Sequence, residues 1–146
     1  MGRIEKSIEI RAPPEKVWEM SAFDRMPEYC DVAELKSAKY TSEIRTPEDK
    51  YRVGATAHMT EKHGEYDVEV IESVENEKLT YRSKGKYVMT ITSILKPVED
   101  RTKLTVVYEL KMPWGILGKA LYKLWQGTEE KMFEKSLEKL KSILEK

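Results

Sequence analysis

The sequence has little cysteine and almost no side-chain amide. Cys30 is the only cysteine among 146 residues, and Asn76 and Gln126 are the only amide side chains. A single cysteine excludes an intramolecular disulfide and a four-cysteine metal site. Scarce Asn, Gln and Cys beside abundant Lys and Glu is typical of hyperthermophile proteins, so we expect a thermophilic source.

The chain also lacks a net charge and a long hydrophobic run. Basic and acidic residues number 26 each, so the sequence gives no reason to expect nucleic acid as a partner. Charged residues make up 36% and apolar residues 40%, which is too charged for a membrane span and too hydrophobic for a disordered chain. The length fits one domain, covering residues 1–146. Because Met1–Lys6 has no apolar signal-peptide core, we expect the protein to be cytoplasmic.

Most of the chain has the period-two alternation of strands. Ile4, Ile8 and Ile10 alternate with polar residues, and two short helices are predicted next, over Pro14–Met20 and Phe23–Tyr29. Six strand-like runs then extend from residue 35 to residue 111. They are separated by short turn sequences at Arg45–Asp49, His63–Gly64, Glu75–Glu77, Lys84–Lys86 and Pro97–Asp100. Consecutive strands with such short connections are antiparallel neighbours.

After Pro113 the period changes to that of an amphipathic helix, predicted from Leu117 to Glu145. Such a helix is about 42 Å long and must lie along the whole sheet. The fold class is therefore α+β, with a curved six- to seven-stranded antiparallel sheet around the long helix and two short helices after the first strand. One helix cannot fill the inside of so wide a sheet, so we expect a hollow beside it.

The parity of each strand predicts which side chains face this hollow. The inward set combines apolar residues with several Tyr and Ser hydroxyls and the carboxylate of Glu61. It is too polar for a dry core, because a buried hydroxyl without a partner costs roughly 1–3 kcal/mol. We therefore predict that a ligand or water is held there, by Phe23, Met26, Met59, Glu61, Tyr66, Val68, Tyr81, Ser83, Tyr87, Met89, Ile91, Val106, Tyr108, Met112, Leu121 and Trp125.

The segment Ile8–Trp18 resembles the opening motif I-x-A-P-x-E-x-V-W of the START-like (SRPBCC) superfamily. Further segments are also similar to that superfamily, in the same order: Val53–Gly54, Val70–Arg82, Leu104–Leu110 and Phe133–Lys141. The resemblance is strongest to the polyketide cyclase/dehydrase-like branch, related to coenzyme Q-binding and birch-pollen-allergen-like proteins. It implies the helix-grip fold and a cavity for hydrophobic small molecules, but no particular reaction.

Three functions remain open. The leading hypothesis is binding or transport of a hydrophobic molecule, ring-containing or lipid-like, without a cofactor or a metal. The first alternative is an aromatase/cyclase- or dehydratase-type enzyme acting on a polyketide-like substrate, with Glu61 or Tyr66 as the acid/base candidate. The second is a protein-interaction module of the chaperone-cofactor kind. The enzyme needs a polar pair inside the cavity, whereas the interaction module needs an exposed apolar patch.

Several smaller features bear on these hypotheses. Glu61 is predicted to hydrogen-bond Tyr66 across the His63–Gly64 turn, at the rim of the hollow. A metal site at His58 and His63 is not expected, because His58 and Glu61 have opposite parity. The uncharged stretch Met112–Gly118 is a packed turn, an apolar gate at the mouth of the cavity, or a patch that touches a membrane transiently when ligand is exchanged. Cys30 is expected to be a small buried residue, and the oligomeric state is left open.

Overall fold

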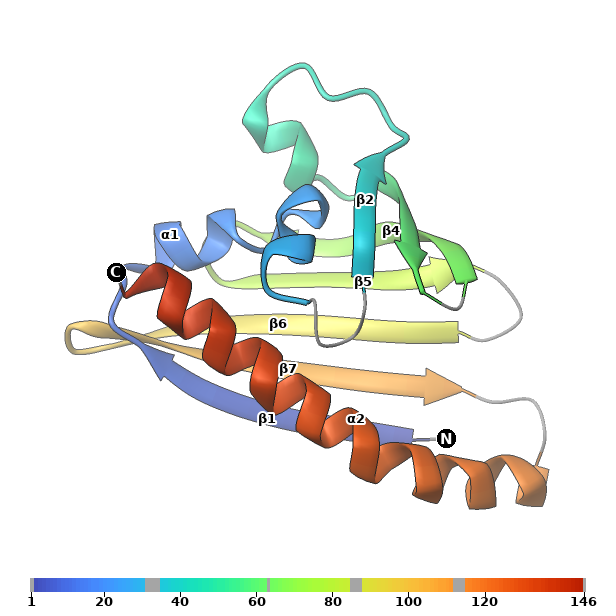
Figure 1. Ribbon diagram of the computed structural model, residues 1–146. Helices are drawn as coiled ribbons and strands as arrows, with labels where there is room; N and C mark the ends of the chain where they lie inside the picture. The colour runs from blue at the N-terminus through green and yellow to red at the C-terminus, as the bar shows by residue number, and fades with distance from the viewer. Residues whose placement is uncertain (1, 31–34, 63, 85–87, 112–114, 146) are drawn as a thin grey trace.

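The computed structural model describes residues 2–30, 35–62, 64–84, 88–111 and 115–145, with the backbone alone for residues 2 and 111 and for 115–129. Figure 1 shows one sheet with a long helix across it. The strands are β1 Gly2–Ile10, β2 Leu35–Tyr40, β3 Thr56–Glu61, β4 Gly64–Val74, β5 Lys78–Lys84, β6 Val88–Val98 and β7 Arg101–Lys111, and the helices are α1 Pro14–Glu19, the 3-10 helices η1 Phe23–Glu28 and η3 Pro47–Tyr51, and α2 Gly115–Leu144.

The seven strands form one curved antiparallel sheet in the order β1-β7-β6-β5-β4-β3-β2. Each strand from β2 to β7 lies beside its neighbour in sequence, as the short turns predict. The exception is β1, which returns to pair with the last strand, from Gly2 opposite Leu110 to Ile10 opposite Thr102. The predicted α+β helix-grip architecture is confirmed, and the number of strands is seven.

Helix α2 crosses the concave face obliquely over β7 and β1 (Figure 1). The Lys6 ammonium on β1 lies 2.9 Å from Glu134 and 3.8 Å from Glu130 of the helix. At the C-terminal end, the backbone N–H of Arg11 donates to the Glu145 carboxylate over 2.8 Å. Polar contacts to β1 and to the residue after it therefore hold α2 along one edge of the sheet, while the opposite edge, at β2, has η1 for cover.

Among the most deeply buried side chains of the core are residues of β1, η1 and β4. Ile10, Phe23 and Val68 have at most 1% of their surface exposed. The Phe23 ring packs edge-on against Tyr81 with its centroid 5.0 Å away. Thr102 is fully buried as well, and its hydroxyl donates to the Ala12 carbonyl over 2.7 Å, which satisfies a polar group that apolar packing would leave unpaired.

Two strands differ from the prediction because of local backbone features. Pro97 was expected to end its strand, yet β6 continues to Val98. Proline is tolerated there because β5 pairs with β6 only as far as Ile94, so this part of β6 has a strand on one side only. In β4, a bulge between Val70 and Glu72 reverses the parity, and Val74 turns outward with 44% of its surface exposed.

Strand β2 is also shorter than predicted. The strand expected over Leu35–Ile44 ends at Tyr40, and the expected loop contains the 3-10 helix η3. The Tyr40 hydroxyl accepts from the Phe23 N–H at 2.9 Å and donates to the Lys50 carbonyl at 3.1 Å. These bonds fix η1 and η3 to each other beside the concave face.

Candidate functional site

A hollow of about 680 Å³ lies between the concave face, the α1–η1 segment and the C-terminal half of α2. Its wall comes from every strand of the sheet except β1. From the helix, Phe133, Leu137 and Leu140 reach into it. The short helices contribute Val17 and Met26, so the hollow is walled by segments far apart in the sequence.

Ten of the sixteen predicted site residues line this hollow. They are Met26, Met59, Glu61, Tyr66, Tyr81, Ser83, Met89, Ile91, Val106 and Tyr108. Phe23 and Val68 are not among the residues that line it; both are packed in the core, with at most 1% of their surface exposed. Tyr87 and Met112 lie outside the described residues, and the side chains of Leu121 and Trp125 lie outside the described part of α2.

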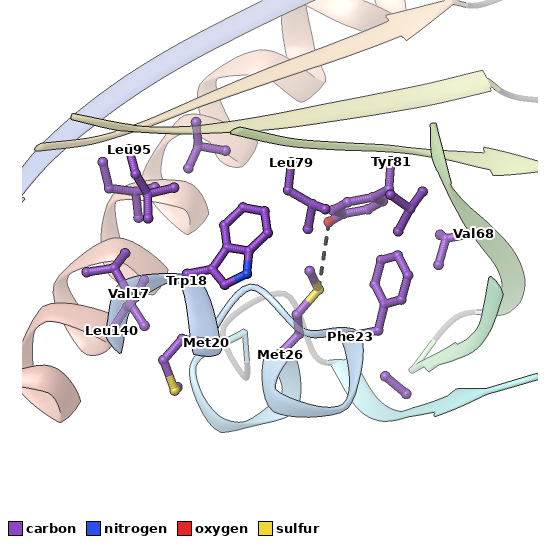
Figure 2. Close-up of a cluster of buried hydrophobic side chains, with 14 of the residues drawn as sticks. Val17, Trp18, Met20, Phe23, Met26, Val68, Leu79, Tyr81, Leu95 and Leu140 are labelled. Atoms are coloured by element: carbon purple, nitrogen blue, oxygen red, sulfur yellow. Dashed lines mark hydrogen bonds between the residues drawn. The ribbon is translucent and has the colours of Figure 1, made fainter. Parts of the chain in front are cut away.

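One end of the hollow is walled by leucines, and we call it the leucine end. Leu95 on β6 is opposite Leu104 on β7. Leu79 on β5 is opposite Ser93, which is the inward residue of β6 next to Leu95. Leu137 and Leu140 of α2 complete it. All five side chains are less than 9% exposed. Figure 2 shows Leu95, Leu79 and Leu140 close to Val17 and Trp18 of α1.

The opposite end, which we call the hairpin end, carries Glu61, Tyr66 and Ser83. Glu61 is opposite Gly64 at the β3–β4 turn, and Tyr66 is opposite Met59. The Tyr66 hydroxyl donates to Glu61 Oε1 over 2.8 Å, so the hydrogen bond predicted across this turn is present. The Ser83 hydroxyl accepts from the Met89 N–H at 2.9 Å, which orients it at the same end of β5.

The surroundings of Tyr66 keep its hydroxyl protonated. Burial raises the pKa of Tyr66, and the neighbouring Tyr81 and Glu61 raise it further. The hydrogen bond to the Glu61 carboxylate acts in the same direction, because a phenolate could no longer donate. Tyr66 is therefore a hydrogen-bond donor and not a base at neutral pH.

Two tyrosines lie in the middle of the hollow, in one row across the sheet. Tyr81 on β5 is opposite Ile91 on β6, which is opposite Tyr108 on β7. The Tyr81 hydroxyl points to the Met26 sulfur at 3.8 Å (Figure 2), and a thioether is a weak acceptor. Burial raises the pKa of Tyr81, so this hydroxyl also stays neutral and can donate to a molecule in the hollow.

The short helices and the residues beside them supply a part of the wall that strand parity could not predict. Met20, Ser21, Tyr29 and Cys30 line the hollow as well. The Tyr29 hydroxyl donates to the Met20 carbonyl at 2.9 Å, and burial raises the pKa of Tyr29. Cys30, expected to be buried, is half-buried and faces the hollow. Their positions depend on how α1 and η1 fold back over the sheet, for which the sequence holds no periodic signal.

His58 lies on the outer face of the sheet, as parity predicts. His58 Nδ1 is 2.9 Å from Asp67 Oδ1, and Nε2 is 3.5 Å from Glu65. Hydrogen bonds to Asp67 and then to Glu65 raise the pKa of His58. Within the described residues, no group of three or more His, Cys, Asp or Glu side chains is arranged to hold a metal ion. No helix in the described part of the chain is long and apolar enough to cross a membrane.

Solved structures with the same architecture cover nearly the whole chain. A Bacillus halodurans protein solved in solution is 20% identical, with a TM-score of 0.76 over 99% of this chain and 98% of its own. A Thermus thermophilus crystal structure is 17% identical, with a TM-score of 0.72 over 97% and 95% of the two chains. The Aha1 dimer of Colwellia psychrerythraea is 18% identical, with a TM-score of 0.64 over 99% and 97%. At these identities the similarity shows a common fold.

A search of curated proteins found no match. The family model described as "polyketide cyclase / dehydrase and lipid transport" matches residues 1–145. This match agrees with the START-like (SRPBCC) resemblance of the opening motif and with the sheet that curves around α2. The chain therefore belongs to the polyketide cyclase/dehydrase and lipid transport family.

Proposed function

We propose that the protein binds a hydrophobic small molecule, ring-containing or lipid-like, in the hollow of the concave face and carries it. The observation that supports this most strongly is the hollow of about 680 Å³ itself. Small-molecule pockets have volumes of roughly 300–1,000 Å³, with mostly apolar walls and a few polar groups that fix orientation. The leucine end supplies such walls, and Tyr66, Tyr81 and Glu61 supply the polar groups.

Native mass spectrometry of the purified protein tests this proposal. We expect a species heavier than the chain by the mass of one small molecule, and solvent extraction should recover that molecule. After extraction, a neutral hydrophobic dye such as Nile red should bind in a ratio of one to one. Apo-protein that takes up neither the dye nor any amphiphile would count against the carrier function.

The Glu61–Tyr66 hydrogen bond favours an enzyme of the cyclase or dehydratase kind as the second candidate. A carboxylate beside a neutral phenol is a pair that can accept a proton at one atom and donate one at another. The pair faces the hollow, where a substrate would lie. Turnover of a polyketide-like test substrate that Glu61→Gln abolishes without weakening its binding would support this candidate. Equal turnover by both proteins would remove it.

The third hypothesis, a protein-interaction module, has less support in the described residues. Val74 and Ile94 are exposed on the convex face, at 44% and 38%. Lys78 lies between them, opposite both in the sheet register, and forms an ion pair with Glu72 at 2.7 Å. A charged pair therefore interrupts the apolar surface at this point. The alternative of membrane contact concerns Met112–Gly118, whose side chains lie outside the described residues, and stays a prediction.

A further inference from the structure

The polarity of the hollow's wall changes along β5 from one end to the other. On β5 the inward residues are Leu79, Tyr81 and Ser83 in order. Leu79 and Ser83 are separated by about 13 Å along β5, because a strand rises about 3.3 Å per residue. On β7, Leu104 lies at the same end as Leu79, and on β4, Tyr66 lies at the same end as Ser83. A molecule with one apolar and one polar end would therefore lie with its polar end at the hairpin end.

Glu61 gives the hairpin end its chemical preference. Its carboxylate accepts the Tyr66 hydroxyl at Oε1. Among the described residues, no Lys, Arg or His forms an ion pair with it. The second oxygen is thus available to a hydrogen-bond donor that enters the hollow. Because a carboxylate accepts hydrogen bonds and does not donate them, it favours an amine or a hydroxyl and repels another carboxylate.

The other charged groups at this end already have partners of opposite charge. Glu65 lines the rim and lies 3.5 Å from His58. Lys84 also lines the rim and lies 3.9 Å from Glu69. Glu61 is therefore the charge at the hairpin end that a ligand would compensate.

We propose that the hollow selects amphiphiles whose polar end is a hydrogen-bond donor, an amine or a hydroxyl, over those that end in a carboxylate. Glu61 is the residue that makes this selection, and Tyr66 is the positioning residue that holds its carboxylate toward the hollow. The inference rests on the proposed function and specifies the class of ligand.

Displacement of Nile red by decylamine, decanol and decanoate tests the inference, because these probes share one chain and differ at the polar end. In the wild-type protein we expect affinities in the order decylamine, decanol, decanoate. The amine should bind at least about tenfold more tightly than the carboxylate, as expected for a hydrogen bond to a charged group. In Glu61→Gln the difference should fall below about threefold, which corresponds to less than the contribution of one such bond.

Glu65→Gln is the matched control, since it removes the same charge from the same rim. It should keep most of the preference, because Glu65 already pairs with His58. Thermal melts of each variant report whether folding is preserved, and the wild-type order tests the inference even if a variant fails to fold.

The outcomes separate the two proposals. If neither the dye nor any of the three probes binds, the proposed function fails and the inference fails with it. If all three bind with equal affinity, the hollow is a hydrophobic site, but the role of Glu61 is wrong. Tightest binding by decanoate would also overturn the inference and would point to Lys84. A preference that Glu65→Gln removes as fully as Glu61→Gln would show a general charge effect and contradict the assignment to Glu61.

Discussion

The leucine end and the hairpin end of the hollow share β5, but they otherwise come from different elements and differ in what their side chains contact. At the leucine end, Leu104 and Leu140 are at most 4% exposed and contact other apolar side chains. At the hairpin end, Glu61 and Tyr66 are only half-buried and contact each other through a hydrogen bond.

This difference separates stability from recognition. Burying apolar surface contributes most of the free energy of folding, and the leucine end does this without specific polar geometry. The hairpin end buries less surface and holds polar atoms in fixed positions, which is what orientation of a ligand requires. Substitutions at the two ends should therefore be distinguishable, by melts at one end and by ligand preference at the other.

The largest effect is expected for Leu104→Ala at the leucine end. Removing this side chain should lower the free energy of unfolding by about 2–5 kcal/mol, because the neighbouring helix and strands cannot collapse fully into the space. Denaturant melts measure this loss. The ratio of decylamine to decanoate affinity should stay unchanged, since the head group lies at the other end. A changed ratio with unchanged stability would show that the two ends are not separate.

Thr102→Val should have the next largest effect, because it deletes a buried polar partner and keeps the shape. The Ala12 carbonyl loses the hydroxyl that donates to it over 2.7 Å. We expect a loss of about 1–3 kcal/mol in the free energy of unfolding, the cost of a buried acceptor without a donor. Equilibrium urea melts should show a lower midpoint with the same slope. A variant as stable as the wild type would mean that water replaces the hydroxyl.

Tyr66→Phe should change ligand preference more than stability. A single hydrogen bond contributes about 0.5–1.5 kcal/mol net, and the ring remains to pack against its neighbours. The preference for decylamine over decanoate should fall, because the Glu61 carboxylate loses the donor that positions it. Displacement titrations measure this, with Tyr40→Phe as the control, since Tyr40 binds Phe23 and Lys50 away from the hollow. Equal loss of preference in both variants would point to a general loosening of the fold.

The smallest effect is expected from His58, on the outer face of the same hairpin. Hydrogen bonds to Asp67 and then to Glu65 raise the pKa of His58 above its ordinary value of 6.5, so its protonation stabilises the fold below about pH 6.5. That contribution is lost as the pH rises through the folded pKa. Relative to His58→Gln, the wild type should therefore become slightly less stable as the pH rises from about 6 through the folded pKa. A relative gain in stability over this range would contradict the assignment, and ligand affinity should not change in either protein.

The sequence was sufficient to predict the sheet and the inward faces of most strands, because the alternation of side chains along each strand directly reflects the pleat. This alternation predicted that Tyr81, Ile91 and Tyr108 face inward, and all three line the hollow. It also predicted the Glu61–Tyr66 bond, since the short turn fixes the register of β3 and β4. The bulge at Val70/Glu72 could not be predicted. An extra residue in one strand leaves no mark in a run of β-branched and acidic side chains.

The wall made by the short helices was also beyond sequence reasoning. Phe23 was predicted to face the hollow, yet it packs in the core against Tyr40 and Tyr81. Met20 and Cys30, which were not assigned to the site, face the hollow. Which side of such a short helix faces inward depends on contacts such as the hydrogen bond of Tyr29 to Met20, which joins residues nine positions apart and leaves no periodic signal in the sequence.

The central claim, that a hydrophobic ligand occupies the hollow of the concave face, is tested most directly by methyl NMR during a titration with decanol. Ile91 and Ile94 are a matched pair, because both lie on β6 and they face opposite sides of the sheet. The account predicts that the Ile91 methyl resonances shift and saturate at one equivalent, together with those of Met59 and Met89, while Ile94 and Val74 do not change. Saturating shifts at Ile94 and Val74 with an unchanged Ile91 would place the ligand on the convex face and contradict it.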